Sequence, residues 1–199
     1  MEVILTFIIS YLVGSISGSF LLGKYFLHKD VRKFGSGNAG TTNAIRVFGM
    51  KIGVLTFLID MLKGSLVAFF LMKYNRDYLF LGILFAIIGH DYPFYMNFKG
   101  GKGIATTFGA FFVINPIWTG VSFLILLLTA KFSGYVSVGS LVFLILNFLS
   151  QIITTNLDKN ELIILIIITI LGFVRHRSNI KRLINRNELT NRRKKWKFQ

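Results

Sequence analysis

Two lysines alternate with glycines in the segment Phe98-Lys-Gly-Gly-Lys-Gly-Ile-Ala-Thr106. Lys99 and Lys102 supply ammonium groups, and the glycines let backbone N–H groups approach a ligand closely. A helical apolar run begins at Ile104, so the positive end of its dipole would face the same place. This pattern predicts an anion site, and phosphate is the anion that fits it best. The glycines concerned are Gly100, Gly101 and Gly103.

Two nucleotide-binding interpretations fail. No Lys-Ser or Lys-Thr pair follows the glycines after Phe98, so the segment is not the phosphate loop of an ATPase. Gly35, Gly37 and Gly40 satisfy the dinucleotide pattern G-x-G-x-x-G, with Asp60 at a suitable distance downstream. No strand precedes these glycines, however, and Asp60 lies inside an apolar run. We therefore reject the dinucleotide fold.

The polar segment around these first glycines is nevertheless rich in hydrogen-bond donors. Small residues allow it to fold tightly, and Arg46 at its end suits bidentate contact with a phosphate. An ordinary flexible loop rarely carries so many different donors, so we interpret the segment as part of the site. The donors are Ser36, Asn38, Thr41, Thr42 and Asn43.

Asp60 and Lys63 are charged residues within an apolar run and share one helical face. A charge inside a membrane span costs about 2.5 to 3.5 kcal/mol, so the pair needs a reason. A structural ion pair and a role in the site are both open from the sequence. His90 lies at the end of the next span, and a lone histidine there is more often structural than catalytic. No His-x-x-x-His or cysteine pattern occurs, and we expect neither a metal nor another cofactor.

Polar residues recur at three-residue spacing after the last apolar segment. His176, Asn179 and Arg182 would lie on one face of a helix that leaves the membrane, which favours a functional role over a merely basic helix end. Ser140, near the start of the sixth span, is another possible donor, although small residues there also suit helix packing.

The composition places these motifs in a membrane protein. Of 199 residues, 53% are hydrophobic, and apolar segments recur along most of the chain. We expect an all-α, polytopic fold in a single domain, residues 1–199, with residues 189–199 as a basic cytoplasmic tail. The apolar segments are Val3 to Leu27, Ile52 to Met72, Leu79 to Phe94, Ile104 to Ile114, Ile117 to Ala130, Val138 to Thr154 and Leu162 to Val174.

The number of spans is six or seven, because Ile104 to Ala130 could be one long helix kinked at Pro116. With seven spans, the three most basic segments share one side of the membrane, and 20 of the 23 Lys and Arg residues lie there. The exceptions are Lys73, Arg76 and Lys159. The positive-inside rule then puts that side in the cytoplasm and the N-terminus outside. It also explains the net charge of +15 without nucleic-acid binding.

The motifs together resemble one family, the bacterial membrane glycerol-3-phosphate acyltransferases that use acyl-phosphate, known as PlsY. Three motifs match in order: Gly35-Ser-Gly-Asn-Ala-Gly-Thr-Thr-Asn-Ala-Ile-Arg46, then Gly89-His with Pro93 and Phe98-Lys-Gly-Gly-Lys-Gly-Ile-Ala-Thr106, then His176-x-x-Asn-Ile-x-Arg-Leu183. The resemblance covers essentially the whole chain. One departure is Arg186, where the family usually has glycine, and we expect it to alter the geometry of the tail.

The resemblance implies seven spans, a site facing the cytoplasm of a bacterial cell, and transfer of a fatty acyl group from acyl-phosphate to the 1-hydroxyl of glycerol 3-phosphate. Ser36, Arg46 and Lys102 would hold the phosphates, while His176 and Asn179 would place the glycerol hydroxyls. The general base stays open between His176 and the donor phosphate. Further binding residues would be Gly37, Asn38, Gly40, Thr41, Asn43, Lys99, Gly100, Gly101, Gly103, Ser140 and Arg182.

Competing classes are a small transporter for an anionic solute and a headgroup or nucleic-acid binder that uses the tail alone. A transporter predicts charges distributed through the bilayer, whereas here only Asp60 and Lys63 lie inside a span. A docked soluble enzyme that makes acyl-phosphate is a possible partner.

Overall fold

A computed structural model describes residues 2–190, and within them every regular element is helical. The expected all-α class is confirmed for this part of the chain. The proposed tail falls mostly at residues 191–199, outside the described residues. The helices are α1 (Glu2–Ser15), α2 (Gly18–Phe26), η1 (Val31–Lys33), α3 (Thr41–Phe48), α4 (Met50–Tyr74), η2 (Arg76–Tyr78), α5 (Leu79–Asp91), η3 (Phe94–Met96), α6 (Ile104–Ile114), α7 (Pro116–Ser133), α8 (Val136–Thr154), α9 (Lys159–Arg175) and α10 (Arg177–Ile184).

Four helical segments of the described chain are long and apolar enough to cross a membrane. They are α4, α7, α8 and the segment Arg76–Met96, which contains α5. The bent pairs α1–α2 (47°) and α9–α10 (51°) raise the number to six if each pair is one span. The remaining apolar helix, α6, has 11 residues. Large apolar side chains such as Ile153 and Ile117 stand exposed on these helices, as expected of surfaces that face lipid.

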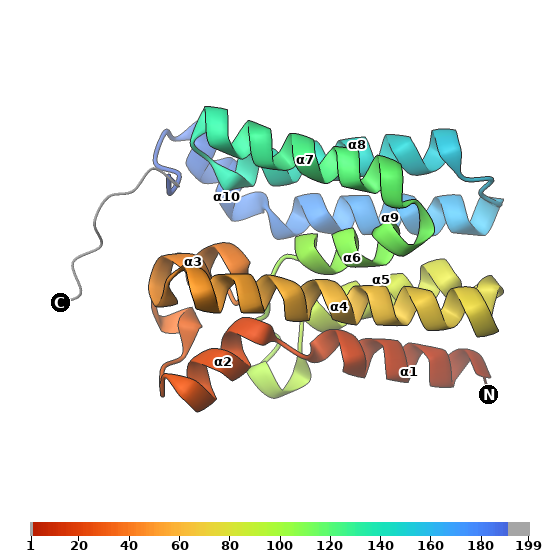
Figure 1. Ribbon diagram of the computed structural model, residues 1–199, viewed down its shortest axis with the longest axis horizontal. Coiled ribbons are helices and arrows are strands. Elements are labelled where there is room, and N and C mark those ends of the chain that lie inside the picture. Colours follow the sequence, from red (N-terminus) through yellow and green to blue (C-terminus); the bar gives the residue numbers. More distant parts are fainter. Residues whose placement is uncertain (1, 191–199) are drawn as a thin grey trace.

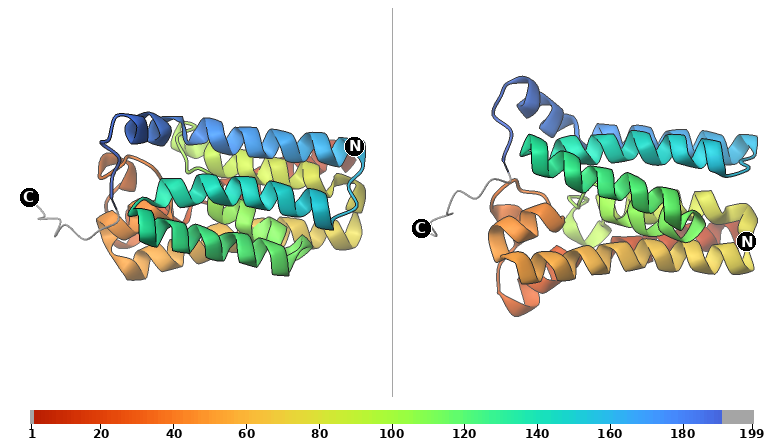
Figure 2. Two further views of the ribbon diagram at one scale, coloured as in Figure 1. Left: turned by 90° about the horizontal axis from the view of Figure 1, so that it is seen from above. Right: turned by 45° about the horizontal axis from the view of Figure 1, so that its top comes forward.

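The long helices run side by side along an elongated bundle (Figure 1). α3, α10 and the segment between α2 and α3 gather at the end opposite the start of α1, and the views in Figure 2 agree. The sequence left open whether Ile104 to Ala130 forms one helix or two. The structure has two, because the chain leaves helical geometry at Asn115 (φ −142°, ψ 81°) and α7 runs back from the end of α6.

Small residues bring α4 and α6 together. A Cβ added to Gly64 would lie 2.2 Å from the Thr106 carbonyl oxygen, and one added to Gly109 would lie 2.0 Å from that of Met61. Ser65 Oγ also donates to the Gly109 carbonyl at 2.9 Å. Such close backbone approach is how helices associate in lipid, where no hydrophobic force drives them together. It fixes α6, and with it the glycine-rich segment that precedes α6.

Asp60 and Lys63 stabilise the break between α1 and α2. Lys63 Nζ donates to the Ile16 carbonyl and lies 3.1 Å from Asp60 Oδ1, while the Gly18 N–H donates to the same carboxylate oxygen at 3.4 Å. His90 Nδ1 lies 2.8 Å from Lys63 Nζ. These side chains satisfy backbone groups that a helix break exposes in an apolar environment. Of the two interpretations of the pair, the contacts support the structural one.

Candidate active site

Asn43 holds the first polar loop together. Its side-chain amide donates to the carbonyls of Val31 and Phe34 at 3.1 and 3.0 Å, and its oxygen accepts the Ser36 N–H at 2.9 Å. Gly35 lies against it with φ 60°, and a Cβ there would lie 2.2 Å from Asn43 Oδ1. Asn43 was predicted as a binding residue, and the structure shows that its buried side chain shapes the loop.

Ser36, Thr41 and Arg46 are among the residues of this loop whose polar side chains stay available. The Ser36 hydroxyl makes no hydrogen bond to the described residues, and Thr41 Oγ1 is buried without a partner there. Arg46, half-buried on α3, is likewise in no ion pair among residues 2–190. Burial lowers the pKa of Arg46, and the nearby Arg182 lowers it further, whereas Glu188 raises it. The remaining predicted residues of the loop, Gly37, Asn38 and Gly40, lie between Ser36 and Thr41.

Two of the three glycines in the glycine-rich segment use their N–H groups within the protein. The N–H of Gly100 donates to the Asp91 carbonyl at 3.1 Å, and that of Gly101 to the His90 carbonyl at 3.0 Å. The last carbonyls of a helix have no partner within the helix. These two N–H groups therefore satisfy the carbonyls at the end of α5. A Cβ at Gly101 would lie 1.9 Å from His90 Nε2, so the packing against His90 requires glycine at this position. Gly103 adopts φ 73° at the start of α6.

Only one of the two predicted lysines joins the other site residues. Lys102 Nζ donates to Asn179 Oδ1, which connects the glycine-rich segment to α10. Lys102 lies outside the spans, and burial lowers its pKa to about 8, with the positive charge of Arg182 as the next cause. Lys99 is exposed and has no hydrogen bond or ion pair among the described residues. The candidate anion site is therefore centred on Lys102.

His176 and Asn179 lie where α9 bends into α10, and both are buried, as a shared helical face predicts. His176 Nδ1 lies 2.8 Å from the Gly172 carbonyl oxygen. In a neutral ring this places the proton on Nδ1 and leaves Nε2 as an acceptor. Asn179 donates through Nδ2 to Glu188 Oε1 at 2.6 Å while its oxygen faces Lys102.

Glu188 is at the centre of the cluster, and the sequence analysis missed it. Its Oε1 accepts from Asn179 and, at 3.0 Å, from Ser137, while its Oε2 pairs with Arg182 Nε at 2.7 Å. The sequence did contain a signal for this residue: Glu188 is the one acidic residue after Val174, in a segment with ten Lys and Arg residues. Ser137, rather than the predicted Ser140, points into the cluster, because Ser140 Oγ donates to the Val136 carbonyl of its own helix at 3.0 Å.

Arg175 is a second residue that the sequence analysis did not assign. Its guanidinium donates to the Gly101 carbonyl through Nη2 at 2.5 Å, lies 4.6 Å from the centre of the Tyr92 ring, and approaches Asp91 Oδ2 at 3.7 Å. It thereby joins the end of α9 to the segment that carries Lys102. Neither carboxylate oxygen of Asp91 has a hydrogen bond among the described residues.

Arg186 adopts a left-handed conformation, φ 56°, at the position where the sequence pattern led us to expect glycine. A non-glycine residue in this conformation costs about 1 to 2 kcal/mol. Glycine avoids this cost, but its more flexible unfolded chain offsets part of the gain. We expect Arg186→Gly to raise the free energy of unfolding in detergent by about 0.5 to 1 kcal/mol. Arg186→Ala removes the same charge but keeps the strain. An equal gain in both variants would show that charge, not backbone conformation, is responsible.

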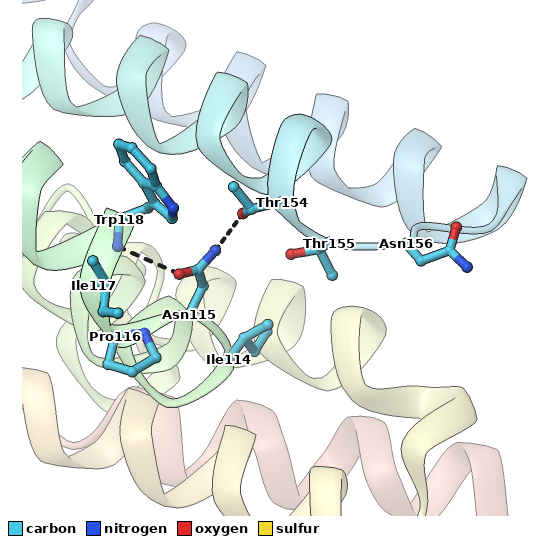
Figure 3. A pocket seen from close by; sticks show the side chains of 8 residues that line it. All are labelled: Ile114, Asn115, Pro116, Ile117, Trp118, Thr154, Thr155 and Asn156. Carbon is cyan, nitrogen blue, oxygen red and sulfur yellow. Dashed lines mark hydrogen bonds between the residues drawn. The ribbon is translucent and has the colours of Figure 1, made fainter.

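A pocket at the other end of the bundle is unconnected with this cluster. Figure 3 shows Asn115 between α6 and α7, with its Nδ2 donating to Thr154 Oγ1 and its Oδ1 accepting the Trp118 N–H at 3.3 Å. No basic side chain lines the pocket. We therefore place the candidate site at the end of the bundle that carries Lys102.

The fold and the cluster define a class: an integral membrane protein of apolar helices with a cluster of basic and polar side chains at one end. A sequence model described as glycerol-3-phosphate acyltransferase matches residues 4–186. A glycerol-3-phosphate acyltransferase of Macrococcus caseolyticus is 42% identical over 194 residues, 94% of this chain and 96% of the relative. Glycerol-3-phosphate acyltransferase 2 of Bacillus anthracis is 41% identical over 187 residues, 93% and 97% of the two chains.

Two solved structures have the same fold. The crystal structure of PlsY, an integral membrane glycerol 3-phosphate acyltransferase, in its glycerol 3-phosphate form superposes with a TM-score of 0.88 at 36% identity over 96% of each chain. Its lysophosphatidic acid form gives 0.85 at 35% identity, covering 96% of this chain and 95% of the other. The chain belongs to the glycerol-3-phosphate acyltransferase family.

Proposed function

We propose that this membrane glycerol-3-phosphate acyltransferase takes its acyl group from acyl-phosphate and transfers it to the 1-hydroxyl of glycerol 3-phosphate. The products are lysophosphatidic acid, which enters phospholipid synthesis, and inorganic phosphate. One observation carries the proposal: Arg46, Lys102 and Arg182 come from three separate segments, Arg182 pairs with Glu188 at 2.7 Å, and the other two lie near enough to feel the charge of that carboxylate. Two phosphate-bearing substrates need such an excess of positive charge.

In this proposal Ser36, Arg46 and Lys102 bind the phosphates, and His176 and Asn179 orient the glycerol hydroxyls. The Thr41 hydroxyl, buried without a partner among residues 2–190, is suited to the acyl-phosphate group. Asn43, Gly100 and Gly101 act by shaping the site, since their polar groups already hold the loop and the end of α5. Gly37, Asn38, Gly40, Gly103, Lys99, Ser140 and Arg182 stay predicted contributors to binding.

The reaction needs no protein nucleophile. The substrate hydroxyl oxygen attacks the acyl carbon, a tetrahedral oxyanion forms, and the bond from that carbon to the phosphate oxygen breaks. Phosphate is a good leaving group, so positioning and charge stabilisation carry the catalysis. We propose that the departing phosphate takes the hydroxyl proton. His176 is the second candidate base, since its Nε2 is free to accept a proton when Nδ1 bonds to the Gly172 carbonyl.

We further propose seven spans, with α6 as the short one between α5 and α7. The N-terminus then lies outside, and the site faces the cytoplasm at the inner, or cytoplasmic, membrane of a bacterial cell. The gathering of α3, α10 and the first polar loop at one end of the bundle supports this orientation, because most basic residues lie there. Acyl-phosphate could then be delivered by a soluble enzyme that produces it.

The experiment that tests the proposal measures phosphate release from synthetic acyl-phosphate by the purified protein, with and without glycerol 3-phosphate. Release that requires glycerol 3-phosphate and yields lysophosphatidic acid is the expected result. Transfer from acyl-CoA instead would contradict the proposed donor. If both donors are inert, transport of an anionic solute becomes the function to test.

A further inference from the structure

The carboxylate of Glu188 lies among groups that the proposed function assigns to the two substrates. Ser137 and Asn179 donate to its Oε1, and Arg182 pairs with its Oε2. Arg46 and Lys102 lie close enough for its charge to act on both. Only 5% of the side chain is exposed. A buried anion with three donors and two further cations nearby has the surroundings that a phosphate would require.

We propose that Glu188 is an internal competitor of the substrate phosphate: its carboxylate lies beside the cations Arg46 and Lys102, holds Asn179 and Arg182, and is displaced when substrate binds. The inference rests on the proposed function, because it assumes that Arg46 and Lys102 bind the substrate phosphates and that Asn179 and Arg182 contact the substrates.

Charge balance favours displacement over joint occupancy. The cluster contains four cationic side chains, Arg46, Lys102, Arg175 and Arg182, and the two substrates together carry about three to four negative charges at neutral pH. If Glu188 stays, it adds a further buried negative charge beside these phosphates. When it leaves, the cations balance the substrate charges more closely, and counting Asp91 beside Arg175 strengthens this conclusion.

The position of Glu188 in the chain allows such a movement. Glu188 follows α10 and lies outside the helices, two residues after the left-handed Arg186. The N–H of Glu188 itself makes no hydrogen bond to α10. A larger movement of the segment would break the bonds of its neighbours, from the Asn187 N–H to the Arg182 carbonyl at 2.9 Å and from Thr190 Oγ1 to the Gly134 carbonyl at 3.1 Å. Displacement would also release Asn179 Nδ2 and Arg182 Nε, which Glu188 now occupies, for contact with the substrate.

The test measures the dissociation constants of glycerol 3-phosphate and of inorganic phosphate for the purified full chain and for Glu188→Gln. We expect Glu188→Gln to bind both ligands about tenfold more tightly, equivalent to about 1.4 kcal/mol, because the competing charge is gone. Glu161→Gln is the matched control: Glu161 pairs with Arg76 at the other end of the bundle, and its loss should leave both constants unchanged. Equal or weaker binding by a Glu188→Gln variant that unfolds at the wild-type temperature would overturn the proposal.

A second measurement keeps Glu188 itself in place. The chain has no cysteine, so a nitroxide attached to Asn187→Cys reports on this segment alone. Saturating inorganic phosphate should sharpen its spectrum as the segment is released, and an unchanged spectrum at saturation would refute displacement. Tighter phosphate binding by Glu188→Gln in a protein that does not turn over acyl-phosphate would leave this inference standing and would instead refute the proposed function.

Discussion

Replacing Lys102 by methionine should lower kcat/KM for acyl transfer by about 10²- to 10³-fold, the scale for losing one preorganised donor to a developing negative charge. Lys102 is the lysine that joins the glycine-rich segment to Asn179 on α10. Methionine keeps the length of the side chain and removes its charge. Steady-state phosphate release with both substrates varied measures the effect.

Lys131→Met is the matched control, because Lys131 is exposed on α7 and makes no hydrogen bond or ion pair with the described residues. Its activity should equal that of the wild type. A similar loss in both variants, or a loss under threefold in Lys102→Met (about 0.65 kcal/mol), would remove Lys102 from the site.

The pH dependence of wild-type activity should also reveal the role of Lys102. Burial and the nearby Arg182 lower the pKa of Lys102 to about 8, so its ammonium group loses the proton as the pH rises through that value. We expect kcat/KM, which reports the free enzyme, to fall above about pH 8. Arginine stays charged over this range, so Lys102→Arg should lose the alkaline decline even if its activity is lower throughout.

Gly101→Ala should be the second severe substitution, with activity reduced at least about a hundredfold, as expected for a displacement of about 1 Å at the site. A Cβ there would lie 1.9 Å from His90 Nε2, and the His90 ring is held by Lys63 Nζ at 2.8 Å. The segment must therefore move away from α5, and it carries Lys102 with it. Activity and the unfolding temperature in detergent measure the two consequences.

Gly120→Ala on α7 is the control for this substitution. The nearest atom to an added Cβ there is Phe112 Cε2, at the ordinary contact distance of 3.6 Å. We expect unchanged activity and equal or slightly higher stability, since alanine favours helix. Wild-type activity in Gly101→Ala would mean that the segment tolerates displacement and that Lys102 is not fixed by it.

The sequence alone determined the fold class and most of the candidate site. Continuous apolar runs of near-span length favour helices in lipid, because a helix pairs its backbone groups within its own segment. Donors at fixed spacing, such as those of His176 and Asn179, could be placed on one face without coordinates. The ordered motifs also led to the correct family.

Only the tertiary structure decided which groups of each motif meet. Glycines before α6 look alike in sequence, but the N–H groups of Gly100 and Gly101 are taken up by the carbonyls that end α5. Glu188 and Arg175 carry no recognisable motif, and their importance comes from contacts with segments 50 to 75 residues away in the chain, such as Ser137 and Gly101. Hydrogen bonds between distant segments depend on how the helices pack, and local spacing contains no record of that packing.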